Sequence, residues 1–188
     1  MYSYKHIIKS IAVVYSMAML FLSCSKESIN TTQLYPENAD IPLSETFDFK
    51  LTYTLKGESV LELTAPLMQD FSNKEKFKYQ YFPKKFKVVL TNKNGDITTI
   101  IADKAYIYKN PSLTELIGNV KIYNDKGASL ETEHLYWDEK NNHIFGEDKT
   151  TLKQNEEMIT GTGFDSSLDF KNVRINQISG RLKIKNQN

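Results

Sequence analysis

The sequence has little of the residues that cross-link small proteins or bind metals through sulfur. It contains one cysteine in 188 residues, which excludes an internal disulfide and a zinc site built from several cysteines. Eight glycines and five prolines are too few for a low-complexity chain. An excess of one charge is also missing, because 24 Lys and Arg balance 23 Asp and Glu. We therefore expect no nucleic-acid partner that is bound through a basic surface.

What is present is the composition of an ordinary globular protein. Hydrophobic residues make up 40% of the chain and charged residues 25%, values typical of folded domains. The length suits one domain of common size. Aromatic residues reach 12%, mostly Tyr and Phe, so a sizeable apolar core can be built.

The longest apolar run lies at the N-terminus and is short. It covers residues 11–22 and follows the basic residues Lys5 and Lys9. A helix of that length extends about 18 Å, whereas a bilayer core is about 30 Å thick, so a signal peptide is expected rather than a membrane span. The run ends in Ser23-Cys24, and a small residue followed by Cys resembles a bacterial lipobox.

We therefore predict three segments. Residues 1–23 are a lipoprotein signal peptide, residues 24–45 are the lipidated N-terminus and a flexible tether, and residues 46–188 are the folded domain. Cys24 is the predicted lipidation site, through which a lipid anchor would hold the protein at a membrane surface. The alternative is an ordinary secreted protein with a buried Cys near its start.

The chain after the tether alternates between apolar and polar residues with a period of two, which is typical of half-buried strands. A Lys56-Gly57 turn and an Asn94-Gly95 pair mark hairpins. No stretch after Cys24 sustains a helical apolar stripe, so an all-β domain of about ten short strands is predicted. The expected strands cover residues 47–54, 61–65, 86–90, 97–108, 116–123, 130–137, 144–152 and 172–184. A weak repeat places Tyr106, Leu135 and Phe164 at equal spacing, as stacked two-strand units would.

Six phrases of the sequence stand out by their order and spacing, and they lie at residues 79–84, 99–105, 118–120, 130–132, 135–138 and 160–164. Together they resemble the LptC family, the periplasmic component of the lipopolysaccharide export machine, in the lipoprotein form of Bacteroidetes-type bacteria. The resemblance covers roughly residues 1–170.

The resemblance implies an open, twisted β-jellyroll of two antiparallel sheets, shared with the soluble bridge protein LptA. It implies a lipopolysaccharide transport component that receives its lipid from the inner-membrane Lpt ABC transporter and passes it to an LptA-like periplasmic bridge. The acyl chains would travel inside the jellyroll, and sheet edges would pair with neighbouring Lpt proteins. We expect the protein on the periplasmic face of the inner membrane, with anchoring in the outer membrane left open. One departure is the lipobox, since the best-known members keep an uncleaved transmembrane helix.

The groove of such a jellyroll would be lined by the alternate apolar residues of the strands. The same residues would equally line an ordinary closed core, and the pattern does not distinguish the two. The groove candidates are Leu51, Tyr53, Leu61, Leu63, Phe86, Val88, Leu90, Ile100, Ala102, Val120, Ile122, Leu130, Leu135 and Trp137.

Enzyme signatures are weak, and we predict no catalytic residue, metal or cofactor. His134 and His143 lack a metal-ligand spacing, and Gly161-Thr162-Gly163 lacks the Lys of a phosphate-binding loop. Glu131 and Glu133 share a strand face, which a solvated surface explains. The alternative function is an all-β surface lipoprotein that binds a glycan or a protein partner, which an exposed aromatic platform would favour. A hydrolase is the third possibility.

Overall fold

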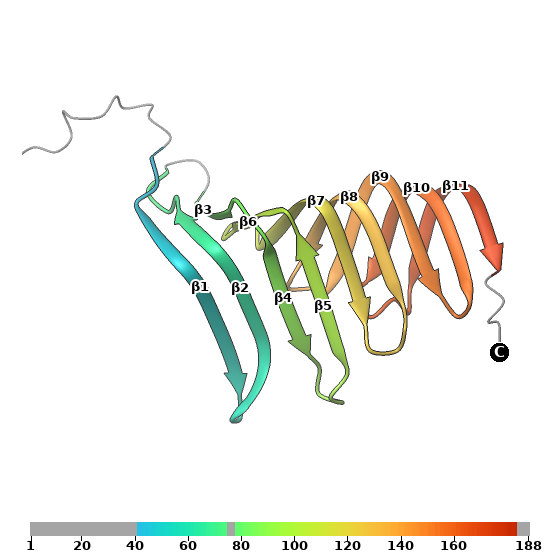
Figure 1. The fold of residues 1–188 in the computed structure, drawn as a ribbon, viewed down its shortest axis with the longest axis horizontal. Coiled ribbons are helices and arrows are strands. Elements are labelled where there is room, and N and C mark those ends of the chain that lie inside the picture. The colour runs from blue at the N-terminus through green and yellow to red at the C-terminus, as the bar shows by residue number, and fades with distance from the viewer. Residues whose placement is uncertain (1–40, 75–77, 184–188) are drawn as a thin grey trace, which may run out of the picture. The chain divides into compact units, whose positions relative to one another are not determined.

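The computed structural model describes residues 41–74 and 78–183, which belong to one compact unit. The predicted signal peptide, the lipidation site Cys24 and most of the predicted tether lie outside the described residues. Every element in the described part is a strand (Figure 1). The strands are β1 (Ser44–Leu55), β2 (Glu58–Asp70), β3 (Tyr79–Phe82), β4 (Phe86–Thr91), β5 (Ile97–Ala102), β6 (Lys104–Tyr108), β7 (Leu113–Asn124), β8 (Ser129–Asp138), β9 (His143–Gln154), β10 (Glu157–Ser167) and β11 (Val173–Lys183).

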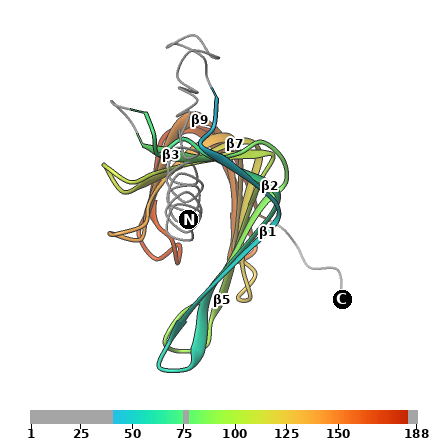
Figure 2. The same cartoon turned by 90° about the vertical axis from the view of Figure 1, so that its left-hand side faces the viewer.

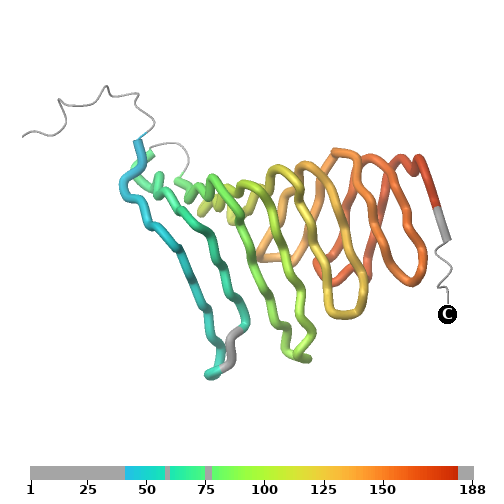
Figure 3. Tube along the Cα trace, in the orientation of Figure 1, coloured from blue at the N-terminus to red at the C-terminus, as the bar shows by residue number. Residues whose placement is uncertain are grey.

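All of the strands pair antiparallel in one continuous hydrogen-bonded ladder. Its order is β11-β10-β9-β8-β7-β5-β4-β2-β3-β6, with β1 paired to β2 and β6 also paired to β7. From β7 to β11 the ladder follows the order of the chain, which the trace in Figure 3 shows as neighbouring strands running from yellow to red. The predicted all-β jellyroll is confirmed, and its two sheets are two layers of the same ladder.

The long strands pass from one layer to the other. The first half of β7 pairs with β6, whereas its second half pairs with β5. We call the layer that contains β3, β6 and residues 113–117 layer A, and the layer that contains β4, β5 and residues 120–124 layer B. Figure 2 shows the long strands bending over between the two layers.

The bend in β7 is built from Gly118 and Asn119, which have φ angles of 78° and 46°. The register between β7 and β8 shifts at the same place, so the bend is a β-bulge, the usual device for turning a strand sharply. Asn119 Nδ2 donates to Asp103 Oδ2 at 2.7 Å. Asp103 lies between the end of β5 and the start of β6, so the bond joins this break to the bend of β7.

The apolar core lies between the two layers. Inward residues of β2 to β10 form one cluster, in which Phe82, Ile100 and Leu116 are fully buried. Burying such side chains contributes roughly 1.5–3 kcal/mol each, so the contact between layers is the main stabilising feature of the domain.

Several strand predictions are confirmed, but β3 and β10 lie outside every predicted range, and two further details are wrong. The Lys56-Gly57 turn has positive φ at both residues, as a tight hairpin requires. The single strand expected over residues 97–108 is broken at Asp103, because β5 and β6 belong to different layers. The repeat is shifted by one residue in its first unit. Ala105, not Tyr106, lies in register with Leu116 and through it with Leu135.

Candidate functional site

The fourteen groove candidates lie on the inner faces of the layers, but their burial differs. Ten of them are at most 5% exposed: Leu63, Phe86, Val88, Ile100, Ala102, Val120, Ile122, Leu130, Leu135 and Trp137. Leu61 and Leu90 are half-buried and pack against the core. Leu51 and Tyr53 are 47% and 57% exposed. The structure therefore joins most of the candidates in a packed interior and leaves a few accessible at one end.

That accessible end is formed by β1 and by the hairpin ends of β2, β4 and β5, and we call it the open end. Leu51 is paired with Leu63, and Tyr53 with Leu61, so both exposed side chains lie on the inner face. Opposite them, layer A has only β3 and β6, which are 4 and 5 residues long. The inner face of β1 is exposed because little of layer A covers it.

Residues 113–167, which form β7 to β10, behave differently, and we call them the sealed segment. Apart from the bulges where the strands bend, their inner side chains alternate with outer ones, and Leu116, Leu130 and Ile144 are 0% exposed. Here both layers are contributed by the same long strands, so the inner residues of one layer are covered by those of the other.

A cavity of about 500 Å³ lies between the strand ends of the two layers at the open end. Leu55, Val60 and Leu90 line it from the side of layer B. Asn142 and Leu168 line it from layer A, and the Leu168 N–H donates to the Asn142 carbonyl at 2.8 Å. We call this cavity the mouth, because an apolar wall faces the end of the interlayer core.

Of the apolar residues at the mouth, only Leu90 was predicted from the sequence. Val60 is the extra residue of a β-bulge, skipped by the pairing between Ser59 and Leu61, so simple alternation misplaces it. Leu168 follows Ser166-Ser167, in a segment with no apolar period. No sequence signal that we can name marks Leu168.

The rim of the mouth carries fixed charge. Lys126 Nζ lies 2.6 Å from Asp96 Oδ2, and Asn92 Nδ2 donates to the same oxygen. These two hydrogen bonds lower the pKa of the Asp96 carboxyl below its usual value. The rim therefore stays polar and solvated beside an apolar wall.

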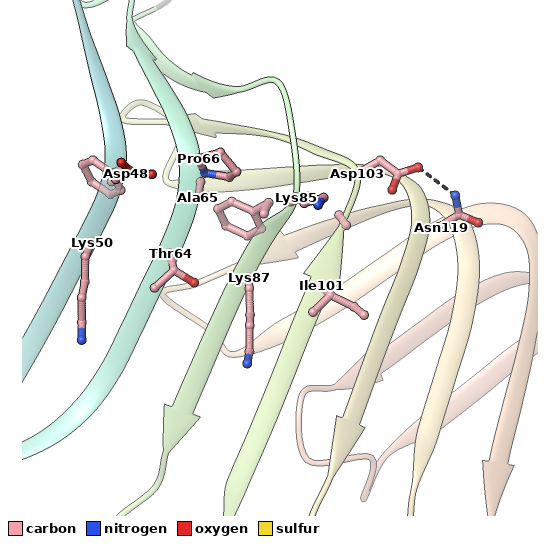
Figure 4. Close-up of a pocket in the computed structure, with 13 residues that line it drawn as sticks. Asp48, Lys50, Thr64, Ala65, Pro66, Lys85, Lys87, Ile101, Asp103 and Asn119 are labelled. Atoms are coloured by element: carbon pink, nitrogen blue, oxygen red, sulfur yellow. Dashed lines mark hydrogen bonds between the residues drawn. The ribbon is translucent and has the colours of Figure 1, made fainter.

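A second cavity, of about 690 Å³, lies along the bend at the open end (Figure 4). Lys50, Lys85 and Lys87 line it together with Asp48 and the bonded pair of Asp103 and Asn119. The groove candidates Phe86 and Ala102 contribute to its floor. With cations and carboxylates mixed, the cavity presents no single charge to a ligand.

The outer face of layer A carries a row of aromatic side chains, which we call the aromatic stripe. It is composed of Tyr79, Tyr81, Tyr106, Tyr108, Tyr136 and Phe145. Tyr81 stacks on Tyr106 with ring centres 4.4 Å apart, and Tyr136 stacks on Phe145 at 5.5 Å. Since these ring faces contact one another, they are not free to stack on a flat ligand.

Hydrogen bonds to a half-buried carboxylate, that of Glu115, tie the stripe together. Tyr108 donates to Glu115 Oε2 at 2.9 Å, and His134 Nε2 lies 2.9 Å from Glu115 Oε1. Burial, with the nearby Tyr81, raises the pKa of Tyr106 to about 12. Burial and the Glu115 carboxylate also raise the pKa of Tyr108. His134, for which we predicted no metal-binding role, is thus placed as a partner of Glu115.

Comparison of the sequence with models of protein families identifies the family to which the chain belongs. A family model described as "Lipopolysaccharide-assembly, LptC-related" matches residues 11–181 of the chain. The chain belongs to the LptC family. No curated protein matches the chain.

LptC proteins are lipopolysaccharide transport components of the periplasm, associated with the inner membrane. Membership implies lipopolysaccharide and the Lpt complex as partners. Within residues 41–74 and 78–183, no three His, Cys, Asp or Glu side chains gather as metal ligands. Within the same residues, no helix is long and apolar enough to span a membrane. The feature of this LptC chain that suits a lipid is its apolar interior, with the mouth at one end.

Proposed function

We propose that this LptC chain receives lipopolysaccharide from the inner-membrane ABC transporter and passes it, through the space between its layers, to an LptA-like periplasmic bridge. The observation that carries the proposal is the inner face of the ladder, which is mostly apolar from β1 to β10 and accessible at the mouth and on β1. Burying an acyl chain of 12 methylenes is worth about 10 kcal/mol at about 0.8 kcal/mol per CH₂. An apolar interior supplies that burial without chemistry, so the role is not enzymatic.

The packed interior of the sealed segment closes by side-chain contacts. Its backbone hydrogen bonds run along the ladder rather than between the inner faces. An acyl chain that parts the layers therefore breaks no backbone pairing, and it replaces one apolar contact by another. The fourteen groove candidates are the residues that would line this path.

Partners would meet the two ends of the ladder. β1 and β11 each pair with one neighbour among the described strands, and a free strand edge is a template for β-augmentation. Lipidation at Cys24 would keep the domain at a membrane surface, either the inner membrane, where transport begins, or the outer membrane. Energy would come from the transporter.

Photo-crosslinking in the full chain tests this function. A photoreactive residue replaces Leu51, Leu90 or Val120 on the inner face, and Glu62 or Lys121 on the outer face serves as the matched control. Crosslinks to lipopolysaccharide at the inner positions and none at the outer ones are expected. Crosslinks at outer positions alone, or none in a folded protein, would refute transport through the interior.

A second candidate is the surface lipoprotein that binds a glycan or a protein partner. The aromatic stripe favours it, because Tyr-rich surfaces are common in interfaces. The self-stacked rings point to a protein rather than a sugar. If inner crosslinks are absent, Tyr136→Ala should abolish partner binding while it leaves the fold intact.

A further inference from the structure

Trp137 is the one tryptophan of the chain, and it carries an unusual polar atom. The side chain belongs to the core cluster and is 4% exposed. Its Nε1 is buried and has no hydrogen-bond partner among the described residues. A buried donor without an acceptor is unfavourable, and most buried polar groups are paired.

The other buried polar side chains of the sealed segment show what is normal here. Thr114 donates to Glu139, Thr132 to the Lys149 carbonyl, and Ser166 to the Ser167 carbonyl. Each hydroxyl is therefore satisfied within the protein. The indole N–H is the exception, so it is available to a molecule that enters the interior.

The position of Trp137 places it close behind the mouth. It lies on layer A and pairs with Thr114 of β7 and Ile144 of β9. The next paired residues, Asp138 and His143, close the β8–β9 ladder. The turn that follows contains Asn142, which lines the mouth. Trp137 is thus the last inner side chain of β8 before the mouth.

We propose that the indole N–H of Trp137 is a subsite for the carbonyl oxygen of an acyl ester or amide. The proposal rests on the proposed lipid path between the layers. A hydrocarbon tail needs only apolar contact, but its carbonyl loses water when it enters and then requires a donor. The indole nitrogen can donate and cannot accept, so it selects oxygen acceptors. Ligand and protein would each satisfy a group that the other leaves unpaired.

The subsite predicts that the interior distinguishes acyl chains from alkyl chains of equal length. Dodecanoyl sucrose and dodecyl maltoside both have a twelve-carbon chain and a disaccharide head, and the first has an ester carbonyl where the second has only a glycosidic oxygen. One neutral hydrogen bond corresponds to about a three- to tenfold difference in affinity. The difference should disappear when the donor is removed.

The first measurement uses the full chain in dodecyl maltoside micelles. A proton–nitrogen correlation spectrum contains a single indole signal, because the chain has one Trp. Exchange into dodecanoyl sucrose, or addition of lipopolysaccharide, should move this signal downfield and slow its exchange with solvent. An indole signal that is identical in both detergents and unchanged by lipopolysaccharide would overturn the subsite.

The second measurement replaces the donor without changing the shape. Biosynthetic incorporation of 3-benzothienylalanine puts sulfur in place of the N–H at this one site, and Trp137→Phe is a second variant. Affinity for lipopolysaccharide and dodecanoyl sucrose should fall about three- to tenfold, while affinity for dodecyl maltoside stays constant. If the isosteric variant is less stable and binds every lipid as before, the indole bonds to an internal water and the subsite is refuted.

The failure of the subsite differs from failure of the proposed function. If inner-face crosslinks form but the protein binds dodecanoyl sucrose and dodecyl maltoside with equal affinity, the subsite is rejected and the lipid path is kept. Absence of inner-face crosslinks, together with no binding of either amphiphile, rejects the lipid path and the subsite with it.

Discussion

The open end and the sealed segment share the same alternation of inner and outer residues, but they bury the inner residues to different extents. Leu51 of β1 is 47% exposed, whereas Leu130 of β8 is 0% exposed. Both are leucines at inward positions of an alternating strand. The difference is the opposite layer, which is complete across β8 and short across β1. Burial in this fold is therefore set by the partner layer, not by the strand.

The largest expected effect separates the two regions by stability. Leu130→Ala should lower the free energy of unfolding by about 3 kcal/mol, since it leaves a cavity in a packed core. Leu51→Ala should cost less than about 1 kcal/mol, because half of the side chain is already in water. Urea denaturation of both variants measures the difference. Equal losses would show that the open end is closed in solution.

A smaller effect is expected from glycines, and it contrasts the same regions. A Cβ on Gly161 of β10 would lie 2.4 Å from Ile175 Cγ2 and 2.6 Å from the Gln177 carbonyl oxygen. Gly161→Ala should therefore destabilise the protein by about 2 kcal/mol. Gly57, at the β1–β2 turn, has a φ of 86° and open space around it, so Gly57→Ala should cost about 1 kcal/mol from backbone strain alone.

Thermal unfolding of these two variants, with Gly180→Ala as control, tests the contrast. Gly180 has nothing within 4 Å of its added Cβ, so its replacement should change stability by less than about 0.5 kcal/mol. A smaller loss of stability for Gly161→Ala than for Gly57→Ala would mean that β11 moves away from β10 easily.

The smallest effect concerns pH and the β3–β6 pair that faces the open end. Burial raises the pKa of Tyr106 to about 12, above the usual value of about 10. The neutral phenol therefore favours the folded state, and its contribution is complete below about pH 10 and lost as the pH rises through about 12. Stability should fall over this interval.

Tyr106→Phe should reduce that fall, although Tyr108 and Tyr136, whose pKa values are also raised, contribute to it. Urea midpoints at about pH 9 and about pH 11 measure the change, and the ultraviolet absorbance of tyrosinate reports the ionisation directly. An identical pH dependence in the variant and the parent protein would place Tyr106 outside the protected stripe.

The sequence by itself determined the local features of this protein. Alternation from Phe47 onward predicted strands, Lys56-Gly57 and Asn94-Gly95 predicted their turns, and the ordered phrases predicted the LptC family. These features depend on neighbouring residues along the chain, because side-chain period and turn chemistry are local properties. For the same reason the inward set, from Leu51 to Trp137, could be named in advance.

The tertiary structure decided every feature that depends on which residues lie across the core from a given strand. Only the two-layer arrangement breaks residues 97–108 at Asp103, exposes Leu51 and buries Leu130. It also brings Leu168 and Leu90 into the lining of one cavity, the mouth, and leaves the Trp137 N–H without a partner among the described residues. These contacts join residues far apart in sequence, and alternation says which face a side chain occupies but not what covers that face.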